Sequence, residues 1–265
     1  MTKLIAEIGW NHMGDMTLAK DMIWAAKESG CDFAKFQTWS VDRLKPGVWD
    51  TDGRREIYEK AELDLDKHFE LKEHCDKVGI GFMSSVFSVE DARLLKQVVT
   101  DNVKIPSFES RNKALIDYCS NNFDKLLIST GTSSWNEIRL NMPIDSSKFT
   151  LLHCVSSYPC NFDIINLGRI DDLRRLNKSV GFSDHTQGIE ASVIALAFGL
   201  DYIEKHFTID NSLPGRDNKF AILPDEMKRL SEYIKIAYQV LISKGINYQE
   251  CETDSRENYT GRFNG

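Results

Sequence analysis

Eight short segments rich in β-branched and aromatic residues recur along the 265 residues of the chain, and helical segments separate them. Strands that alternate with helices of about 10 to 15 residues are typical of βαβ units and a parallel sheet. Eight units leave about 33 residues for each, which fits a (β/α)8 barrel of about 250 residues. The sequence therefore predicts an α/β protein with a single (β/α)8 barrel domain, and a doubly wound sheet is the alternative. The expected strands begin at Lys3, Phe33, Gly79, Asn102, Lys125, Phe149, Ser179 and Asp201.

Two of the intervening helices have recognisable N-terminal residues. The first is expected at 17–28, with Asp15 or Thr17 as its cap, and another is expected at 65–78, directly after Asp64. Short polar side chains at such positions accept hydrogen bonds from backbone amides that have no partner within the helix. Both helices should therefore begin sharply.

The last helix is expected to have Pro224 in its first turn and to stop at Gly245. The chain after this glycine is polar, so we expect residues 1–245 to form the barrel and residues 246–265 to form a C-terminal tail. Neither a second domain nor a repeat is expected. The buried face of the helix, given by 3,4 spacing, should consist of Met227, Leu230, Ile234, Ala237 and Leu241.

The composition excludes several kinds of partner. A net charge of −7 argues against binding to nucleic acid, because such binding depends on cationic groups that meet phosphates. The longest apolar stretch, residues 191–200, is far shorter than the roughly 18 residues that a membrane span needs. The chain starts directly with strand-like sequence, and its six cysteines include no CxxC pair, which suits free thiols in a reducing compartment. We therefore expect a cytoplasmic protein.

Two long irregular segments follow expected strands. They cover residues 38–63, which contain three aromatic residues, and residues 208–223. In a barrel both would lie at the carboxyl ends of the strands, where active sites are built, and long loops in such places are often lids. The role of residues 38–63 is otherwise open.

Chemically reactive side chains gather at the ends of the expected strands. In a barrel, residues in such positions would surround a single opening. Side chains alternate along a strand, so Lys35 and Gln37 share a face and Phe36 points to the other side. The strand-end residues are Glu7, Lys35, Gln37, Ser84, Ser85, Lys104, Ser107, Glu109, Ser129, Thr130, His153, Tyr158, Ser183, Asp184, His185, Glu204, Lys205 and His206.

Two histidines end the seventh and eighth expected strands. If these strands are neighbours, His185 and His206 approach the same point, and Glu7 lies nearby because the first strand closes onto the eighth. Two imidazoles and a carboxylate suit a divalent transition metal with open positions. The alternative is that each histidine is simply hydrogen-bonded near the core.

Two lysines lie within apolar strands, where an ammonium group is costly to bury unless it is paired. An anionic ligand, phosphate or carboxylate, would pair with Lys35 and Lys104, and nearby serine hydroxyls would donate to it. The alternative is a set of structural ion pairs with Glu7, Glu109 or Glu204. Glu109 could also serve as a general acid or base.

Seven segments, in order along the chain, together resemble the N-acetylneuraminate (sialic acid) synthase family. The resemblance implies a (β/α)8 barrel, in agreement with the strand count. It also implies an enzyme that condenses phosphoenolpyruvate with an N-acylated amino-sugar aldehyde, usually N-acetylmannosamine, to give a nine-carbon keto-sugar acid and phosphate. The segments begin at Ile5 (IAEIGWNHMGD), Ala34 (AKFQT), Val103 (VKIPSFES), Leu126 (LLISTGTSSWNEI), Leu151 (LLHCVSSYP), Gly181 (GFSDHTQG) and Tyr202 (YIEKHFTIDNSLPGRD).

The resemblance also implies roles for individual residues. His185 and His206 take the positions of the metal ligands, for Mn²⁺ or a substitute such as Mg²⁺ or Co²⁺, and Glu7 lies near the metal and the attacking water. We expect Glu7, Lys104 and Glu109 to take part in catalysis. The positions that hold phosphoenolpyruvate are Lys35, Lys104, Ser107, Ser129 and Ser183, and those that face the amino sugar are Gln37, Glu109, Tyr158 and Asp217.

The chain departs from the family pattern in three places. Most members continue into a C-terminal antifreeze-like domain that crosses a dimer and offers an arginine to the N-acyl group, whereas this chain stops at Gly265. The pair Ser156 and Ser157 replaces a polar amide found in some members, and residues 38–63 do not align clearly. A homodimer is implied by the resemblance. Another chain supplies the missing contact, the acceptor is recognised differently, or activity is lost.

Two further functions remain as alternatives to a synthase of sialic acid or a related nonulosonic acid. One is a different phosphoenolpyruvate-dependent synthase that makes a shorter keto-sugar acid. The other is a non-catalytic barrel that binds a sugar. The complete set of His, Lys and Glu side chains favours the enzyme, because a binding protein does not need these catalytic groups.

Overall fold

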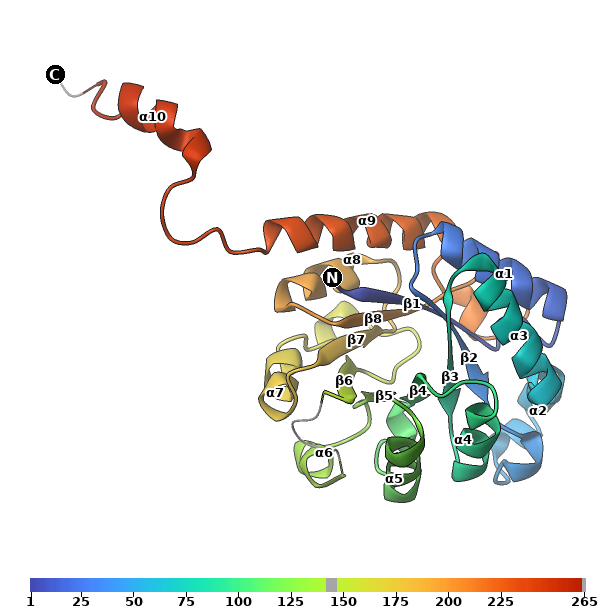
Figure 1. The fold of residues 1–265 in the computed structure, drawn as a ribbon. Coiled ribbons are helices and arrows are strands. Elements are labelled where there is room, and N and C mark those ends of the chain that lie inside the picture. Colours follow the sequence, from blue (N-terminus) through green and yellow to red (C-terminus); the bar gives the residue numbers. More distant parts are fainter. Residues whose placement is uncertain (142–146, 264–265) are drawn as a thin grey trace.

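The computed structural model describes residues 1–141 and 147–263. Within them eight parallel strands form a closed barrel in sequence order, and helices surround it (Figure 1). The predicted (β/α)8 barrel is confirmed, and the alternative of a doubly wound sheet is wrong. The strands are β1 Lys3–Gly9, β2 Phe33–Thr38, β3 Gly81–Val86, β4 Asn102–Ile105, β5 Lys125–Ser129, β6 Phe149–Cys154, β7 Val180–Asp184 and β8 Tyr202–His206.

The helices begin where capping residues predict. In α1 the Asp15 carboxylate accepts hydrogen bonds from the amides of Thr17 and Leu18, so Asp15 rather than Thr17 is the cap. In α3 the Asp64 carboxylate accepts one from the amide of Lys67, and this helix has the predicted bounds. The helices are α1 Met16–Glu28, α2 Arg54–Ala61, α3 Leu65–Val78, α4 Val89–Lys96, α5 Lys113–Asn122, α6 Trp135–Asn141, α7 Arg169–Leu176, α8 Glu190–Ala195, α9 Pro224–Val240 and α10 Thr253–Asn258.

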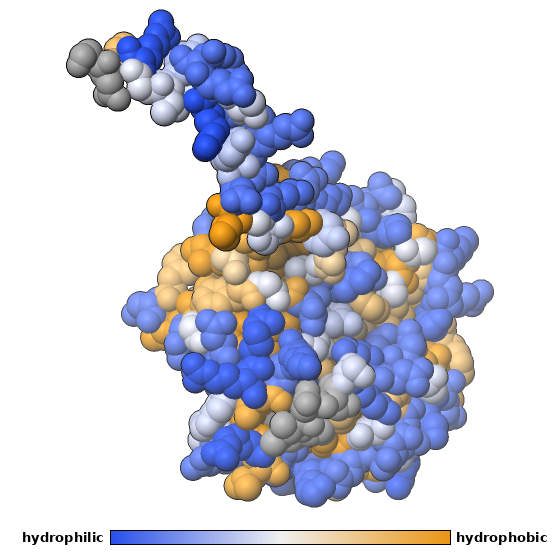
Figure 2. Space-filling model, turned by 60° about the vertical axis from the view of Figure 1, so that its left-hand side comes forward, coloured by the Kyte–Doolittle hydropathy of each residue, from blue (hydrophilic) through white to orange (hydrophobic). Residues whose placement is uncertain are grey.

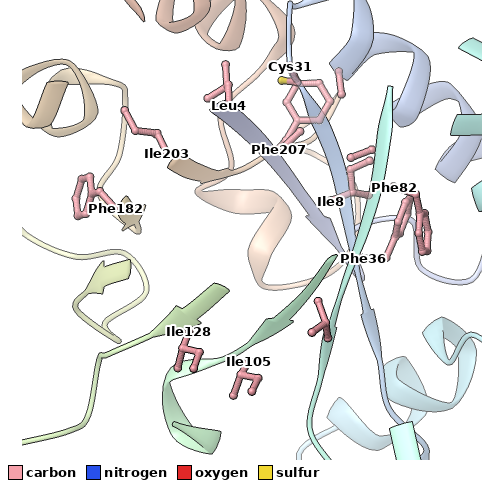
Figure 3. Packing of buried hydrophobic residues seen from close by; sticks show 14 of the residues in the cluster. Leu4, Ile8, Cys31, Phe36, Phe82, Ile105, Ile128, Phe182, Ile203 and Phe207 are labelled. Carbon is pink, nitrogen blue, oxygen red and sulfur yellow. The ribbon is translucent and has the colours of Figure 1, made fainter. Parts of the chain in front are cut away.

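The main apolar core lies between the barrel and its helices. Phe36 packs there 5.9 Å from Phe82, ring centre to ring centre, as expected for a residue on the opposite face from Lys35 (Figure 3). Burial of such aromatic side chains is a major stabilising term, of roughly 1.5–3 kcal/mol for a large apolar side chain. Figure 3 labels Leu4, Ile8, Cys31, Phe36, Phe82, Ile105, Ile128, Phe182, Ile203 and Phe207 from this layer.

A second, smaller cluster fills the inside of the barrel. It consists of Ile5, Met83, Leu127 and Leu152, one each from β1, β3, β5 and β6, and bulky apolar side chains of this kind fill the interior of such barrels. Because inward positions recur at every second residue, the next inward residues on the same strands are Glu7, Ser85, Ser129 and Cys154. The apolar layer is therefore the floor beneath a polar layer at the carboxyl ends of the strands.

The chain leaves the barrel at the end of α9. This helix ends at Val240, five residues before Gly245, and Leu241 is 52% exposed. The prediction that Leu241 continues the buried face is wrong, because the helix ends at the preceding residue, and the chain then leaves the body of the molecule (Figure 1). The C-terminal segment stands clear of the body of the molecule and is largely hydrophilic in Figure 2. Across the described residues, no helix is both long enough and apolar enough to span a membrane.

The two long segments after β2 and β8 are partly ordered into regular structure. Residues 38–63 contain two short 3₁₀ turns and the helix α2, so the expectation of an irregular segment is wrong for its second half. The helix is short and its sequence is mostly charged, so it lacks the apolar residues at helical spacing by which a helix is predicted from sequence. Both segments contribute side chains to the opening at the carboxyl ends of the strands.

Candidate active site

A cavity of about 940 Å³ opens at the carboxyl ends of the strands. Its size is at the upper end of the usual range for ligand sites, about 300–1,000 Å³. The structure brings every one of the twelve residues singled out as site residues to the wall of this cavity. They are Glu7, Lys35, Gln37, Lys104, Ser107, Glu109, Ser129, Tyr158, Ser183, His185, His206 and Asp217.

Some other strand-end residues point away from the cavity, and for these the prediction of a shared opening is wrong. His153 Nε2 donates a hydrogen bond to the carbonyl oxygen of Ile165 at 2.7 Å, and the imidazole stacks on Phe182. Ser84 is hydrogen-bonded to the hydroxyl of Thr38 at 2.7 Å, among the helices. Alternation along the strand explains this, since the neighbouring positions Ser85 and Cys154 take the inward direction. Thr130, Asp184 and Lys205 also lie outside the cavity.

Asp184 and Lys205 form a buried ion pair behind the two histidines. The Lys205 ammonium lies 3.0 Å from Asp184 Oδ2 and also donates to the carbonyl oxygen of Thr186. Ser192 donates to the same carboxylate oxygen at 2.6 Å. Each member directly precedes His185 or His206 in sequence, so the pair joins β7 to β8 at the level of the imidazoles.

Four charged side chains form a cluster above the apolar floor. Lys35 Nζ lies 2.5 Å from Glu7 Oε2 and 3.5 Å from Glu204 Oε2. Lys104 Nζ donates to both oxygens of Glu204, at 2.9 and 2.8 Å, across the barrel interior. Both lysines are thus ion-paired, as the alternative interpretation holds, and their partners are Glu7 and Glu204. Glu109 instead accepts a hydrogen bond from Asn112 at 2.9 Å.

The cluster shifts the pKa of each member. Burial raises the pKa of Glu7, whereas Lys104 and Lys35 outweigh burial and lower the pKa of Glu204. Burial and the neighbouring Lys35 lower the pKa of Lys104. Glu204 is therefore the carboxylate that the cluster holds ionised, and Glu7 is the more easily protonated one.

Hydroxyl groups surround the lysines. Ser85 accepts a hydrogen bond from Lys35 at 2.8 Å, and Ser183 donates to Glu204 at 2.8 Å. The buried hydroxyl of Ser129 has no hydrogen-bond partner among the described residues, which makes it a donor available to a ligand. Gly131 approaches the same wall closely, because a Cβ there would lie 2.7 Å from the hydroxyl oxygen of Ser107.

The two histidines lie side by side, with ring centres 5.5 Å apart. His185 Nδ1 is 2.8 Å from the carbonyl oxygen of Val155, so Nδ1 carries a proton, and Nε2 has a lone pair for a metal when the imidazole is neutral. His206 Nδ1 is buried and lacks a hydrogen-bond partner in the part of the chain that the structure describes. Burial and the nearby His185 lower the pKa of His206, which favours the neutral imidazole that a metal requires.

This arrangement fits a divalent cation held through His185 and His206. The carbonyl contact of His185 is the outer support that metal-binding histidines usually have. Within residues 1–141 and 147–263 no group of three or more His, Cys, Asp or Glu side chains is arranged as a metal site. The two imidazoles would therefore leave several positions of the cation to oxygen ligands from substrate or water.

Cys154 is a further titratable group of the cavity, and the sequence alone assigned no role to it. Its sulfur lies 3.7 Å from His185 Nδ1 and accepts a hydrogen bond from Ser107 at 3.3 Å. Burial opposes ionisation, but His185, Ser107 and Lys104 together lower the pKa of Cys154 to about 7. The alternation that places Lys35 inward also places Cys154 inward, so register was the signal that could have found it.

The rest of the cavity wall consists of aromatic, amide and carboxylate side chains. The Tyr158 ring packs on His185 with ring centres 4.2 Å apart, and Gln37 donates to Glu7 Oε1 at 2.8 Å. Asp217 accepts a hydrogen bond from the indole of Trp10 at 2.7 Å, and burial raises its pKa. Sequence reasoning did not assign Trp10 or the central role of Glu204, although Glu204 shares a face with His206.

The fold and this cavity define a (β/α)8-barrel protein with a charged site at the carboxyl ends of its strands, the position that active sites take in this architecture. The sequence model of the NeuB family matches residues 22–245, and the chain belongs to that family. The resemblance stated from the seven segments is thereby confirmed.

Relatives with assigned activities make sugar acids. The chain is 37% identical over 260 residues to the N,N'-diacetyllegionaminic acid synthase of Legionella pneumophila, covering 90% of this chain and 72% of that protein. It is 33% identical over 254 residues to the pseudaminic acid synthase of Campylobacter jejuni serotype O:2, covering 90% and 74%. The crystal structure of the N-acetylneuraminic acid synthetase from Leptospira borgpetersenii in complex with citrate superposes with a TM-score of 0.86 at 30% identity, covering 99% of this chain and 92% of that one.

Proposed function

We propose that the chain condenses phosphoenolpyruvate with an N-acylated amino-sugar aldehyde, N-acetylmannosamine or a related hexosamine, to give a nonulosonic acid and phosphate. The observation that carries the proposal is the meeting of a buried lysine–glutamate cluster and two adjacent imidazoles in one cavity. The family and the activities named for its relatives support the same reaction.

The lysines would hold phosphoenolpyruvate. Lys35 and Lys104 are buried and share Glu204, so a bound phosphate or carboxylate would replace part of an existing ion-pair network rather than meet a bare charge. The free hydroxyl of Ser129 would donate to the same anion, and Ser107 and Ser183 line the same wall. The cationic groups would also offset negative charge on the departing phosphate.

His185 and His206 would hold the divalent cation, with Mn²⁺ as our first choice and Mg²⁺ or Co²⁺ as substitutes. When bound, such a cation polarises a carbonyl oxygen and so favours attack on the aldehyde carbon. Tyr158 packs against both imidazoles, at 4.2 and 6.1 Å between ring centres, and so restricts their orientation.

The atoms of the reaction balance with water as the third reactant. The enol carbon of phosphoenolpyruvate forms a bond to the aldehyde carbon, water adds to the carbon that bears the phosphate, and phosphate leaves as the keto group forms. Glu7 is suited to accept the proton of that water, because burial raises its pKa towards that of a general base. Glu109, on the cavity wall, is proposed as a second acid or base beside the sugar.

The acceptor would lie against Gln37, Tyr158 and Asp217. Asp217 is held by Trp10 and is 3.8 Å from His206 Nδ1, so a sugar hydroxyl that meets Asp217 would place its aldehyde near the imidazoles. We extend the proposal to a cytoplasmic homodimer, and sedimentation of the purified protein measures its oligomeric state.

Phosphate release tests the proposal. It should require phosphoenolpyruvate, an N-acylated hexosamine and Mn²⁺ together, and mass spectrometry should find the nine-carbon acid. His185→Ala and His206→Ala should abolish release and weaken Mn²⁺ binding, whereas His74→Ala on α3, outside the cavity, is the matched control. If both active-site variants bind Mn²⁺ like the wild type, the metal assignment is wrong. Tight sugar binding without turnover would instead favour a non-catalytic barrel, and turnover with shorter acceptors only would favour another keto-acid synthase.

A further inference from the structure

Four aromatic side chains form one side of the cavity, and none of them was assigned a role by the sequence. Trp10 follows β1, whereas Trp39, Trp49 and Tyr58 come from residues 38–63; together they are the aromatic wall. Tyr58 links two of the indoles, with ring centres 5.3 Å from Trp10 and 5.7 Å from Trp39. All four side chains are half-buried and line the cavity, so a ligand there would contact them.

The aromatic wall begins at the acceptor side of the proposed reaction. The indole N–H of Trp10 donates to Asp217 Oδ2 at 2.7 Å, and Asp217 is near His206. A sugar that reaches Asp217 would therefore extend along Trp10 and Tyr58. Aromatic faces cover the apolar C–H surfaces of such ligands, and their N–H and O–H groups satisfy polar atoms.

Trp49 has an unused donor in this wall. Its Nε1 is buried but has no hydrogen-bond partner anywhere in residues 1–141 and 147–263. A buried N–H without a partner is costly, and an indole N–H can only donate. The group that completes it must therefore present an acceptor oxygen, such as an amide carbonyl, next to apolar surface.

We propose that the aromatic wall binds the N-acylamino group of the acceptor sugar, with Trp49 Nε1 donating to the acyl oxygen and the rings covering the acyl methyl group. This inference rests on the proposed function, since it names the residues that select its acceptor. Recognition of the acyl group then comes from residues 38–63 of this chain. A protonated amine would also be attracted by the rings, but it would leave the indole donor without an acceptor.

Gly47 controls where the Trp49 indole lies. A Cβ at Gly47 would be 2.5 Å from the indole atoms Cη2 and Cζ2. The backbone of Gly47 is extended, with φ of −170°, so an alanine is allowed there and the indole must move instead. The turn itself is held by Asp50, which accepts from the Gly47 amide at 2.8 Å and pairs with Arg55 at 2.8 Å. Gly47→Ala therefore displaces the indole without removing it.

The experiment compares two sugars that differ at the acylamino position, N-acetylmannosamine and mannose. Trp49→Phe keeps a ring but removes the donor, Gly47→Ala displaces the indole, and Trp24→Phe on α1, where the side chain is 57% exposed, is the matched control. Calorimetry gives the dissociation constants, and thermal unfolding confirms that each variant is folded. We expect Trp49→Phe and Gly47→Ala to weaken N-acetylmannosamine binding by about three- to tenfold, the value of one hydrogen bond. The same two variants should change mannose binding by less than about twofold. Trp24→Phe should change the binding of neither sugar.

Each other result overturns the inference. It is wrong if both variants bind N-acetylmannosamine like the wild type, if they lose the same factor for both sugars, or if the wild type binds none of these sugars. It is also wrong if mannosamine binds the wild type more tightly than N-acetylmannosamine, which would indicate a cation site. Turnover is measured separately. If the wild type binds N-acetylmannosamine more tightly than mannose but releases no phosphate, the proposed condensation is refuted and the acyl-binding role is not. If turnover is normal and the variants still prefer N-acetylmannosamine as the wild type does, only the acyl-binding role of the aromatic wall is refuted.

Discussion

Glu204→Gln removes the carboxylate that both cavity lysines share. The side chains of Lys35 and Lys104 are only 2% and 3% exposed, and each Glu204 oxygen accepts from Lys104, at 2.9 and 2.8 Å. The amide would leave two buried ammonium groups with Glu7 as the only remaining carboxylate of the cluster. Removing one partner of a buried ion pair costs about 3–5 kcal/mol, so the free energy of unfolding should fall by that amount.

Thermal unfolding followed by circular dichroism measures this loss. About 1 kcal/mol corresponds to roughly 2–4 °C for a chain of this size, so Tm should fall by about 6–20 °C. Phosphoenolpyruvate should restore more stability to the variant than to the wild type, because an anion supplies the missing negative charge and binding to the folded state stabilises it. Glu109→Gln is the matched control, since Glu109 lines the same cavity but its carboxylate accepts a hydrogen bond from the uncharged Asn112. Equal Tm values for the two variants would refute the reasoning.

Three further predictions follow from other buried groups. Burial lowers the pKa of His12 and of His153 to about 4. The stability that depends on their neutral forms is present above about pH 6.5 and is lost as the pH falls towards 4, so the free energy of unfolding in urea should fall by about 2 kcal/mol per histidine between pH 7 and pH 5. Equal stability at the two pH values would contradict this prediction. Asp184→Ala leaves Lys205 buried without its carboxylate, so the free energy of unfolding in urea should fall by about 3–5 kcal/mol. A loss below about 1 kcal/mol would contradict this, because exposed ion pairs contribute no more than that. Ser129→Ala removes a hydroxyl without a partner among the described residues, so calorimetry should show phosphoenolpyruvate binding about three- to tenfold weaker at unchanged Tm, and unchanged affinity would exclude this hydroxyl from the anion site.

Alternation along the strands made most of the fold and cavity predictable. The period of two that places Phe36 in the core also places Lys35 and Gln37 in the cavity, and the order of the barrel brings His185 next to His206. These inferences require only that the strands are located in the sequence and that consecutive strands are neighbours in the barrel. The same rule was applied too loosely to His153, which lies one position from the inward Cys154.

Contacts across the barrel and within the long segment were not predictable in this way. Lys104 and Glu204 are 100 residues apart and come from β4 and β8, so their pairing depends on the width of the closed barrel. The aromatic wall depends on how residues 38–63 fold over the opening, for which no periodic pattern exists. The sequence therefore located the twelve predicted site residues in the cavity, but it missed Cys154 and Trp10 and left open which carboxylates pair with the two lysines.

The fate of the oxygen atoms tests the proposed reaction most directly. The purified chain is incubated with phosphoenolpyruvate, N-acetylmannosamine and Mn²⁺ in water enriched in ¹⁸O, and the released phosphate is analysed by mass spectrometry. If water adds to the carbon that bears the phosphate, the bridging oxygen leaves with phosphorus and the phosphate contains no ¹⁸O. Phosphate that carries one ¹⁸O atom would show attack at phosphorus, and the condensation proposed for this cavity would be wrong.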